Sequence, residues 1–320
     1  MRHFLIDTDT ASDDAVALLM ALRWQDVTVE AITIVSGNMP AHQGAKNALY
    51  CVELVGANVP VYIGATKPLL RDNVHAEWFH GNDGLSDRNY PAAKQTVSDK
   101  HAVDAIIETV KAHPGIVIVT LGPLTNIALA VSRAPEIVAN VSRCVVMGGA
   151  ACTEGNVTPA AEYNIWVDPE AARIVFHSGL PVEMVGWEHC RFDKALDEDD
   201  MAMVRAMNTP LAHFTLDCNE TAIAAYYTQS GARGLSLPDP IAMAVALEPD
   251  IVTESSLHYV DVETHSELTR GMTVVDHLNV THDERNRQTW ASLLSKQPNV
   301  RVVWGIDTAK WKEMLYRVLR

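Results

Sequence analysis

The chain has 320 residues, 48% of them hydrophobic and 20% charged, and 40 acidic against 25 basic side chains give a net charge of −15. This composition is typical of a globular protein with a large core, and the negative charge disfavours binding to nucleic acid or to an anionic membrane. The five scattered cysteines form no C-x-x-C pair, no apolar run reaches ~18 residues, and no signal-peptide pattern precedes the first strand, so we expect a cytoplasmic protein without disulfides or membrane spans.

Short apolar runs alternate with helical patterns along the first 190 residues. In chain order, strands are predicted at residues 3–6, 27–35, 61–63, 116–120, 143–147 and 182–185, and helices at residues 14–23, 41–54, 124–131 and 169–177. Val/Ile-rich strands separated by helices indicate an α/β fold, a mostly parallel Rossmann-like sheet flanked by helices. Ligands of such sheets bind at the carboxyl ends of the strands.

The remaining segments complete a single predicted domain, residues 1–320. Residues 67–93 and 148–161 are long and irregular, as binding loops usually are, and residues 195–227 are predicted to form a helical lid region. Further strands are expected at residues 257–262, 272–275 and 300–303, and a closing helix from Thr308. There is no repeat or linker that would divide the chain.

Four aspartates lie within eight residues where the first strand ends: Asp7, Asp9, Asp13 and Asp14. Such close carboxylates repel one another, and no Lys or Arg lies between them. A divalent cation would solve this, and all-oxygen ligands favour Ca²⁺ or Mg²⁺. The simpler alternative is a helix N-terminus with an acidic cap and first turn, which accounts for one or two of the four.

Polar residues also follow other predicted strands. Asn38 comes after Gly37 and suits either a tight turn or a hydrogen bond to a polar ligand. In the turn after residue 120, the carbonyl of Leu121 can join a calcium shell. Asp239 precedes the predicted helix 241–246, where the simple alternative is an N-cap with proline at the first helical position. A metal-ligand role for Asp239 is favoured only if Asp239 lies beside the aspartates at the end of the first strand.

Two irregular segments add further candidates. Asn156, Glu162 and Asn164 surround the exit of the strand 143–147 and suit a neutral polyol such as a sugar, although a solvated polar loop is the alternative. His80 lies in the loop 67–93 beside Trp78 and Phe79. These two aromatic rings are candidates either for stacking on a base or for anchoring the loop to the core.

Together these residues carry a resemblance to the inosine-uridine-preferring nucleoside hydrolase family. Ten motifs occur in register from Asp7 to about Asp276: Asp7-x-Asp9-x-x-x-Asp13-Asp14, Gly37-Asn38, His80-Gly-x-x-Gly-Leu85, Gly122-Pro-Leu-Thr-Asn126, Met147-Gly-Gly149, Glu154-Gly-Asn156, Ala161-Glu-x-Asn164, Asp168-Pro-Glu-Ala-Ala172, Asp239-Pro240 and Gly271-Met-Thr273. The resemblance implies a Ca²⁺-dependent N-ribohydrolase, active in nucleoside catabolism or purine salvage, that splits a nucleoside into ribose and base. It also implies a homodimer or homotetramer.

The resemblance further implies roles for individual residues. Calcium would be held by Asp9, Asp14, Asp239 and the Leu121 carbonyl, and Asp9 would act as general base on a water molecule. The ribose would be bound by Asp13, Asn38, Asn156, Glu162 and Asn164. Carboxylates around the sugar would stabilise the positive charge of an oxocarbenium-like transition state.

The chain departs from the family pattern at two places. Thr10-Ala11 stands where Pro-Gly is usual, and Pro238 stands where a histidine normally serves as the acid for the leaving base. Because proline cannot transfer a proton, His80, His189, Tyr226 or Tyr227 is expected to supply it. Alternatively, Trp78 stacks on a purine and raises its basicity. The hypothesis is a purine-leaning or altered substrate preference.

Two other functions fit parts of the sequence. The Asp7-x-Asp9 pair matches the first part of the haloacid-dehalogenase-like phosphatase signature, with Asp7 as nucleophile and Asp9 as acid, but no convincing late Gly-Asp-x-x-x-Asp element follows. The second alternative is a nucleoside- or sugar-binding protein without turnover, which the replacement of the acid histidine by Pro238 keeps open.

Overall fold

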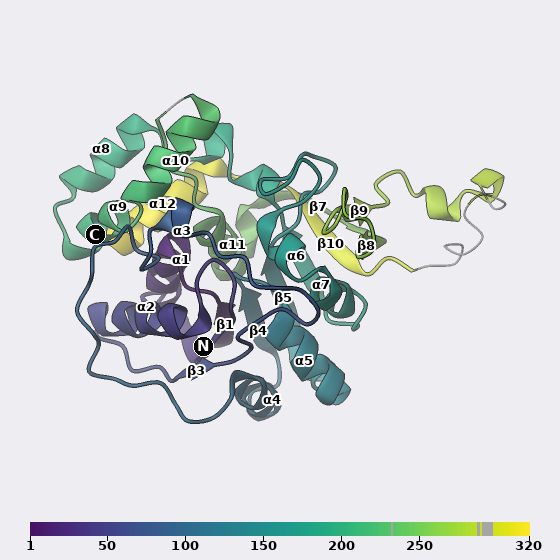
Figure 1. The fold of residues 1–320 in the computed structure, drawn as a ribbon, viewed down its shortest axis with the longest axis horizontal. Coiled ribbons are helices and arrows are strands. Elements are labelled where there is room, and N and C mark those ends of the chain that lie inside the picture. The colour runs from purple at the N-terminus through teal and green to yellow at the C-terminus, as the bar shows by residue number, and fades with distance from the viewer. Residues whose placement is uncertain (232, 287–288, 290–296) are drawn as a thin grey trace.

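The computed structural model describes residues 1–231, 233–286, 289 and 297–320. Its centre is an eight-stranded sheet in the order β3-β2-β1-β4-β5-β6-β10-β7, parallel throughout except for the antiparallel pair β10–β7 (Figure 1). The strands are β1 (Arg2–Thr8), β2 (Val27–Ile34), β3 (Val61–Ile63), β4 (Ile116–Thr120), β5 (Val141–Met147), β6 (Val182–Val185), β7 (Val252–His258) and β10 (Val300–Ile306). The predicted mostly parallel α/β sheet is confirmed.

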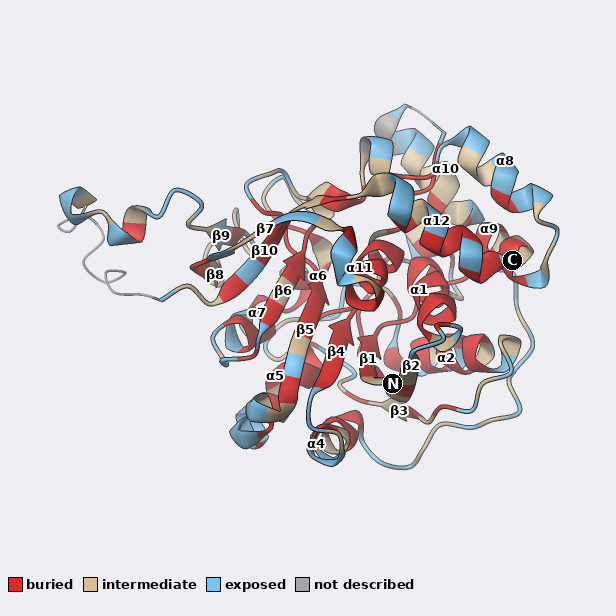
Figure 2. Ribbon diagram, turned by 180° about the vertical axis from the view of Figure 1, so that it is seen from behind, coloured by how far each residue is buried: buried red, intermediate tan, exposed pale blue. Residues whose placement is uncertain are grey.

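Helices cover both faces of this sheet, which is why its strands are buried (Figure 2). One face packs against α1 (Ser12–Leu22), α2 (Ala41–Leu54), α9 (Pro210–Asp217), α11 (Pro238–Leu247) and α12 (Thr308–Leu319). The other face packs against α4 (Ala102–Ala112), α5 (Thr125–Arg133) and α7 (Pro169–Phe176). In the described part of the chain, no helix is both long enough and apolar enough to span a bilayer.

Shorter elements complete the chain. They are α3 (Glu77–His80), α6 (Tyr163–Val167), α8 (Glu198–Ala206), α10 (Glu220–Ser230), the hairpin β8 (Val260–Val262) and β9 (Thr273–Val275), and the 3₁₀ turns Pro135–Asn140, Trp187–His189, Phe192–Lys194, Pro249–Ile251, Val280–His282 and Glu284–Asn286. The helices predicted within residues 195–227 are present as α8, α9 and α10. Of these, α10 packs against α3, which lies in the loop 67–93.

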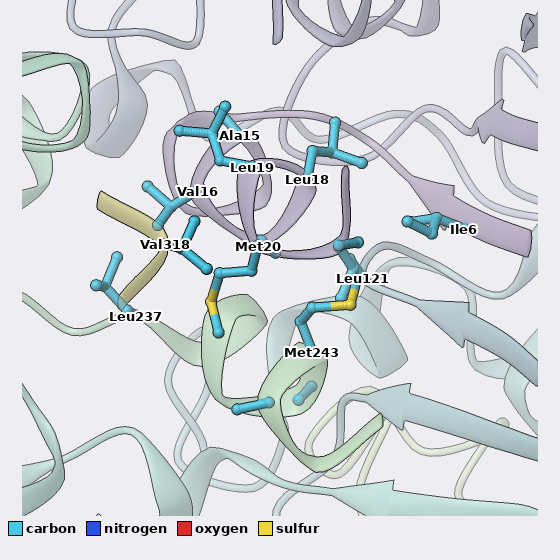
Figure 3. Close-up of a cluster of buried hydrophobic side chains, with 14 of the residues drawn as sticks. Ile6, Ala15, Val16, Leu18, Leu19, Met20, Leu121, Leu237, Met243 and Val318 are labelled. Carbon is cyan, nitrogen blue, oxygen red and sulfur yellow. The ribbon is translucent and has the colours of Figure 1, made fainter. Parts of the chain in front are cut away.

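The packing of α1 against α11 holds two helix N-termini side by side. Figure 3 shows Met20 of α1 pointing toward α11, where Met243 lies beside Leu121, the residue after β4. Leu18 of α1 and Ile6 of β1 belong to the same cluster of buried side chains. All five side chains are fully or almost fully buried, and burying a side chain of this size contributes roughly 1.5–3 kcal/mol. This apolar contact brings Asp13 and Asp14 of α1 close to Asp239 of α11.

The structure differs from the sequence analysis in one omitted helix, one strand prediction and one alternative that the sequence left open. No helix was predicted between residues 93 and 116, where α4 forms with the His101 side chain capping its N-terminus. The single strand predicted at 257–262 is two strands, because β7 ends at His258 in the main sheet and β8 pairs with β9 instead. Asp239 is not an N-cap, because α11 begins at Pro238 and Leu237 precedes it, so the Asp239 side chain is free for other partners.

Candidate active site

Four buried carboxylates converge at the carboxyl end of β1. Asp9 follows the strand, Asp13 and Asp14 lie in the first turn of α1, and Asp239 lies in the first turn of α11. Single oxygens of Asp13, Asp14 and Asp239 lie within 4.8 Å of one another. Asp14 is also within hydrogen-bonding reach of Asp9. These carboxylates, which come from distant segments of the chain, therefore lie together at one place.

Hydrogen bonds from backbone amides and from the Thr8 hydroxyl orient the carboxylates of Asp9 and Asp14. Asp14 accepts hydrogen bonds from the Thr8 hydroxyl at 2.5 Å and from the Ala11 amide at 2.9 Å. The Asn38 amide donates to Asp9 Oδ2 at 2.5 Å. Thr10, where the family pattern has proline, adopts φ of +29° and its amide donates to Thr8 Oγ1 at 3.0 Å. The departure at Thr10-Ala11 thus still permits a tight turn that presents Asp14.

The electrostatics of the cluster call for a cation. Burial, and then the charge of Asp14, raise the pKa of Asp9 and of Asp239 well above the ordinary range, and the same two causes raise the pKa of Asp13 to about 8. Asp9 Oδ1 and Asp13 Oδ1 are buried and have no hydrogen-bond partner in the part of the chain that the structure describes. A cavity adjoins these carboxylates, and no Lys or Arg is among the described residues that line it. This all-oxygen donor set fits a hard divalent cation.

The opposite wall of the cavity is built on α6 and the loop before it. Glu162 caps α6, accepting hydrogen bonds from the Asn164 and Gly149 amides at 2.9 Å each, and burial raises its pKa to about 7. Asn164 Nδ2 donates to the Leu121 carbonyl at 3.0 Å, while its Oδ1 is buried without a partner. Asn156 Oδ1 accepts from the Tyr163 amide at 2.9 Å.

The cavity is lined by all six of the predicted substrate-contacting residues. Asp13, Asn38, Asn156, Glu162 and Asn164 lie on its wall together with Trp78, His80, Leu121 and Asp239. Asp9 and Asp14 lie behind this wall, against Asp239. Asp7 takes no part, because its Oδ1 accepts hydrogen bonds from Thr33 at 2.5 Å and Asn126 at 2.8 Å inside the sheet.

His80 lies on α3 at the edge of this cavity. Its Nδ1 is 2.8 Å from the Ser12 hydroxyl and 3.9 Å from Asp13 Oδ1. Burial lowers the pKa of His80 to about 3, so its ring is neutral at pH 7. Trp78 is 67% exposed and meets the edge of the Phe79 ring. Of the four side chains proposed to protonate the base, only His80 is among the described residues lining the cavity.

Sequence reasoning missed several residues on the cavity wall, namely His75, Tyr163, Trp187 and Ser236. Tyr163 Oη donates to the Val74 carbonyl at 2.6 Å and so joins α6 to the loop 67–93. Trp187 follows the end of β6, and its amide donates to the Gly149 carbonyl at 2.8 Å. The rule that ligands bind beyond strand ends could have identified Trp187.

Glu188 is a partly buried acid beside this wall. Its Oε2 accepts from the Ala151 amide at 3.2 Å, and its Oε1 has no hydrogen-bond partner among the described residues. Burial raises the pKa of Glu188 from its ordinary value of 4.5 to about 7. The folded state therefore binds a proton that the unfolded state has already lost between pH 4.5 and 7. The stability gained from this proton is full below pH 4.5 and is lost as the pH rises through 7.

We therefore expect Glu188→Gln to stabilise the protein relative to wild type more at pH 8 than at pH 5, by up to about 3 kcal/mol. Glutamine keeps an acceptor for the Ala151 amide and carries no charge at either pH. Urea unfolding at both pH values measures the difference. An equal effect of the substitution at pH 5 and pH 8 would contradict the raised pKa of Glu188.

Comparison with known proteins identifies the family. Residues 4–313 match the family model described as inosine-uridine preferring nucleoside hydrolase. The chain belongs to this family. It is thus a nucleoside hydrolase, an enzyme acting on N-glycosyl bonds, and the phosphatase alternative loses its support.

Individual relatives cover almost the whole chain. An uncharacterized protein of Schizosaccharomyces pombe is 39% identical over 85% of this chain and 88% of its own length. The pyrimidine-specific ribonucleoside hydrolase RihA of Shewanella baltica is 36% identical over 100% of this chain and 96% of its own. Among solved structures, a plant nucleoside hydrolase has a TM-score of 0.91 at 29% identity, covering 99% of this chain and 98% of its own. The purine-preferring ribonucleoside hydrolase of Gardnerella vaginalis has a TM-score of 0.87 at 32% identity, with the same coverage.

Proposed function

We propose that the protein hydrolyses the N-glycosidic bond of ribonucleosides to ribose and free base in a Ca²⁺-dependent reaction. The observation that carries this proposal is the convergence of buried carboxylates, without Lys or Arg, beside a cavity that is also lined by Asn38, Asn156, Glu162 and Asn164. Acid and amide groups of this kind match the hydroxyls of a sugar. The acidic wall also suits the positive charge that develops on ribose in the transition state.

The residues assigned to the metal are Asp9, Asp14, Asp239 and the Leu121 carbonyl. Their donor atoms are all oxygens, and Asp14 lies in reach of both Asp9 and Asp239. When bound, the ion would orient a water molecule and the ribose 2′- and 3′-hydroxyls and lower the pKa of that water. Asp13 is close enough to Asp14 and Asp239 to share in this site, but we assign it to the ribose, which is the role that the family resemblance implies.

In this proposal Asp9 is the general base. Its unpartnered Oδ1 takes a proton from the attacking water. The water oxygen forms a bond to C1′, the C1′–N bond breaks, and its electron pair leaves with the base. Asp13, Asn38, Asn156, Glu162 and Asn164 hold the ribose during this step. The amide side chain of Asn164 is already fixed by the Leu121 carbonyl, which orients its free Oδ1 for a substrate hydroxyl.

His80 is proposed to hydrogen-bond the departing base, because Pro238 offers no proton. In the tautomer that accepts the Ser12 hydroxyl at Nδ1, the proton is on Nε2 and available to the base. We expect His80→Gln to slow nucleoside hydrolysis about 10²-fold. Hydrolysis of 4-nitrophenyl riboside, whose leaving group departs as a stable anion, should change little. Equal slowing of both substrates would instead indicate that His80 only supports α3.

Ribose release is the test of the proposed function. Reducing sugar is measured with inosine, adenosine, uridine and cytidine before and after dialysis against a chelator, and after Ca²⁺ is added back. We expect turnover to be lost on chelation and restored by Ca²⁺, since the carboxylates repel one another without it. Equal activity after exhaustive chelation would refute the metal dependence. Nucleoside binding without any sugar release would favour a binding protein.

The same measurement addresses base preference. We propose a purine lean because Trp78, Tyr163 and Trp187 line the cavity and can stack on a large base. Similar proteins carry both pyrimidine-specific and purine-preferring names, so names alone do not decide this point. Fast hydrolysis of uridine would refute the purine lean. We further propose a cytoplasmic homodimer or homotetramer, for which light scattering gives the mass.

A further inference from the structure

A second cluster of metal-ligand residues lies at the other end of β1. His3 is near the start of this strand, Glu30 is in β2, and His113 ends α4. Six residues of extended chain separate His3 from Asp9, a distance of about 20 Å. The cluster is therefore remote from the proposed active site, and none of its three residues lines that cavity.

An irregularity in the sheet places Glu30 in this cluster. Phe4 pairs with Val29 and Leu5 pairs with Ala31, so Glu30 is an extra residue in β2. Such bulges are rare between parallel strands and re-aim a side chain. Here the bulge directs the Glu30 carboxylate between two imidazoles. One oxygen is 2.7 Å from His3 Nδ1, and the other is 3.6 Å from His113 Nε2.

The two imidazoles also face each other. Their ring centres are 4.6 Å apart with the planes tilted by 34°. One donor atom from each of His3, Glu30 and His113 lies within 4.8 Å of the other two. The three side chains are partly exposed, at 41%, 22% and 29%. A small ion can thus enter from solvent and still meet protein ligands on one side.

We propose that His3, Glu30 and His113 bind a zinc-class divalent transition-metal ion. Two imidazoles and a carboxylate are a ligand set typical of zinc, with water in the fourth position. The nitrogen donors distinguish this site from the all-oxygen active site, which favours a harder ion. In a tetrahedral zinc site, neighbouring donor atoms are ~3.3 Å apart. The His113–Glu30 distance is close to this, and the His3–Glu30 contact must open by a small movement of partly exposed side chains.

Metal binding here would join three elements. His3, Glu30 and His113 connect β1, β2 and α4, two strands and the helix that covers them. An ion that binds the folded but not the unfolded chain stabilises the fold. The expected role is therefore structural and independent of nucleoside hydrolysis. Without an ion, the same residues form two His–Glu contacts and one contact between the imidazole rings.

The test is a ZnCl₂ titration of tag-free protein held in saturating Ca²⁺. Calorimetry and metal analysis after dialysis compare wild type with His3→Gln, His113→Gln and the control His265→Gln. His265 is 85% exposed and lies 3.8 Å from Glu263. The control therefore breaks a His–Glu pair that is not among the described groups of three potential metal ligands. Loss of one ligand should weaken Zn²⁺ binding by more than the roughly 10–100-fold that follows removal of an outer-shell partner.

We expect wild type and His265→Gln to bind one Zn²⁺ that both cluster variants lose. Zn²⁺ should raise the melting temperature of wild type only through this site, and ribose release should be the same in all four proteins. Co²⁺ provides a direct readout, because its visible absorption reports histidine coordination and should disappear in His113→Gln. Failure of wild type to bind Zn²⁺, or equal binding or Co²⁺ absorption in the cluster variants, would overturn the proposal.

Discussion

Asp9→Asn is expected to lower kcat for ribose release by at least about 10³-fold while stabilising the metal-free protein. A general base contributes roughly 10²–10⁴-fold, and in this site the same carboxylate is also assigned to the metal. Asparagine keeps an oxygen that can accept the Asn38 amide, so the loop should retain its conformation. The loss of rate would therefore come from the missing negative charge and proton acceptor.

The gain in stability has the same electrostatic origin. Burial and the charge of Asp14 disfavour ionised Asp9 in the folded chain, so removing this charge relieves repulsion among four carboxylates. In chelator at pH 8, the melting temperature of Asp9→Asn should exceed that of wild type, and Ca²⁺ should raise it less. Asp7→Asn is the matched control, since Asp7 lies two residues earlier and its Oδ1 accepts hydrogen bonds from Thr33 and Asn126 inside the sheet. Near-normal turnover in Asp9→Asn would exclude Asp9 as the base.

Gly37→Ala is expected to inactivate the enzyme by a steric route. A Cβ at residue 37 would lie 2.1 Å from Asp9 Oδ2 and 2.6 Å from Pro123 Cδ. The Asp9 carboxylate cannot move away from this methyl group without leaving its place in the site, because its Oδ2 already accepts the Asn38 amide. Misplacing a reacting group by about 1 Å can cost 10²-fold in rate, and overpacking costs about 1–3 kcal/mol of stability. Steady-state kinetics and thermal unfolding measure the two effects.

The control for this variant is Gly56→Ala. Residue 56 has φ of +69°, and among the described residues no atom beyond its two chain neighbours lies within 4 Å of the position that a methyl group would take there. Alanine therefore causes only backbone strain of ~1–2 kcal/mol. Both substitutions should lower stability, but only Gly37→Ala should lower the rate. A Gly37→Ala enzyme as active as Gly56→Ala would mean that the Asp9 loop tolerates displacement.

The sequence alone was sufficient for the sheet and for most residues of the candidate site. Buried parallel strands are short, continuous apolar runs, so β3, β4 and β6 have the predicted bounds. Strand ends meet at one edge of such a sheet, so polar residues following β2 and β5 could be expected to gather there. Asn38, Glu162 and Asn164 accordingly line one cavity.

Other features depend on contacts between distant segments. The break between β7 and β8 was missed because sheet partners, rather than local pattern, determine where those strands begin and end. Helix α4 was missed although its buried residues Val103, Ile106 and Val110 show helical spacing. The loop 67–93 places His80 against Ser12, and no spacing rule relates residues 68 positions apart. Likewise, the bulge at Glu30 exists only in the pairing of β1 with β2.

The chain by itself thus determined which residues can carry the chemistry, because ligand type, strand periodicity and motif order are local properties. Only the tertiary structure decided which of them act together. Asp239 joins Asp13 and Asp14 because apolar side chains of α1 and α11 pack against each other. Asp7, which differs little from Asp9 in sequence, is withdrawn into the sheet by Thr33 and Asn126. Burial then sets the proton affinity of each carboxyl, and burial is a property of the folded chain.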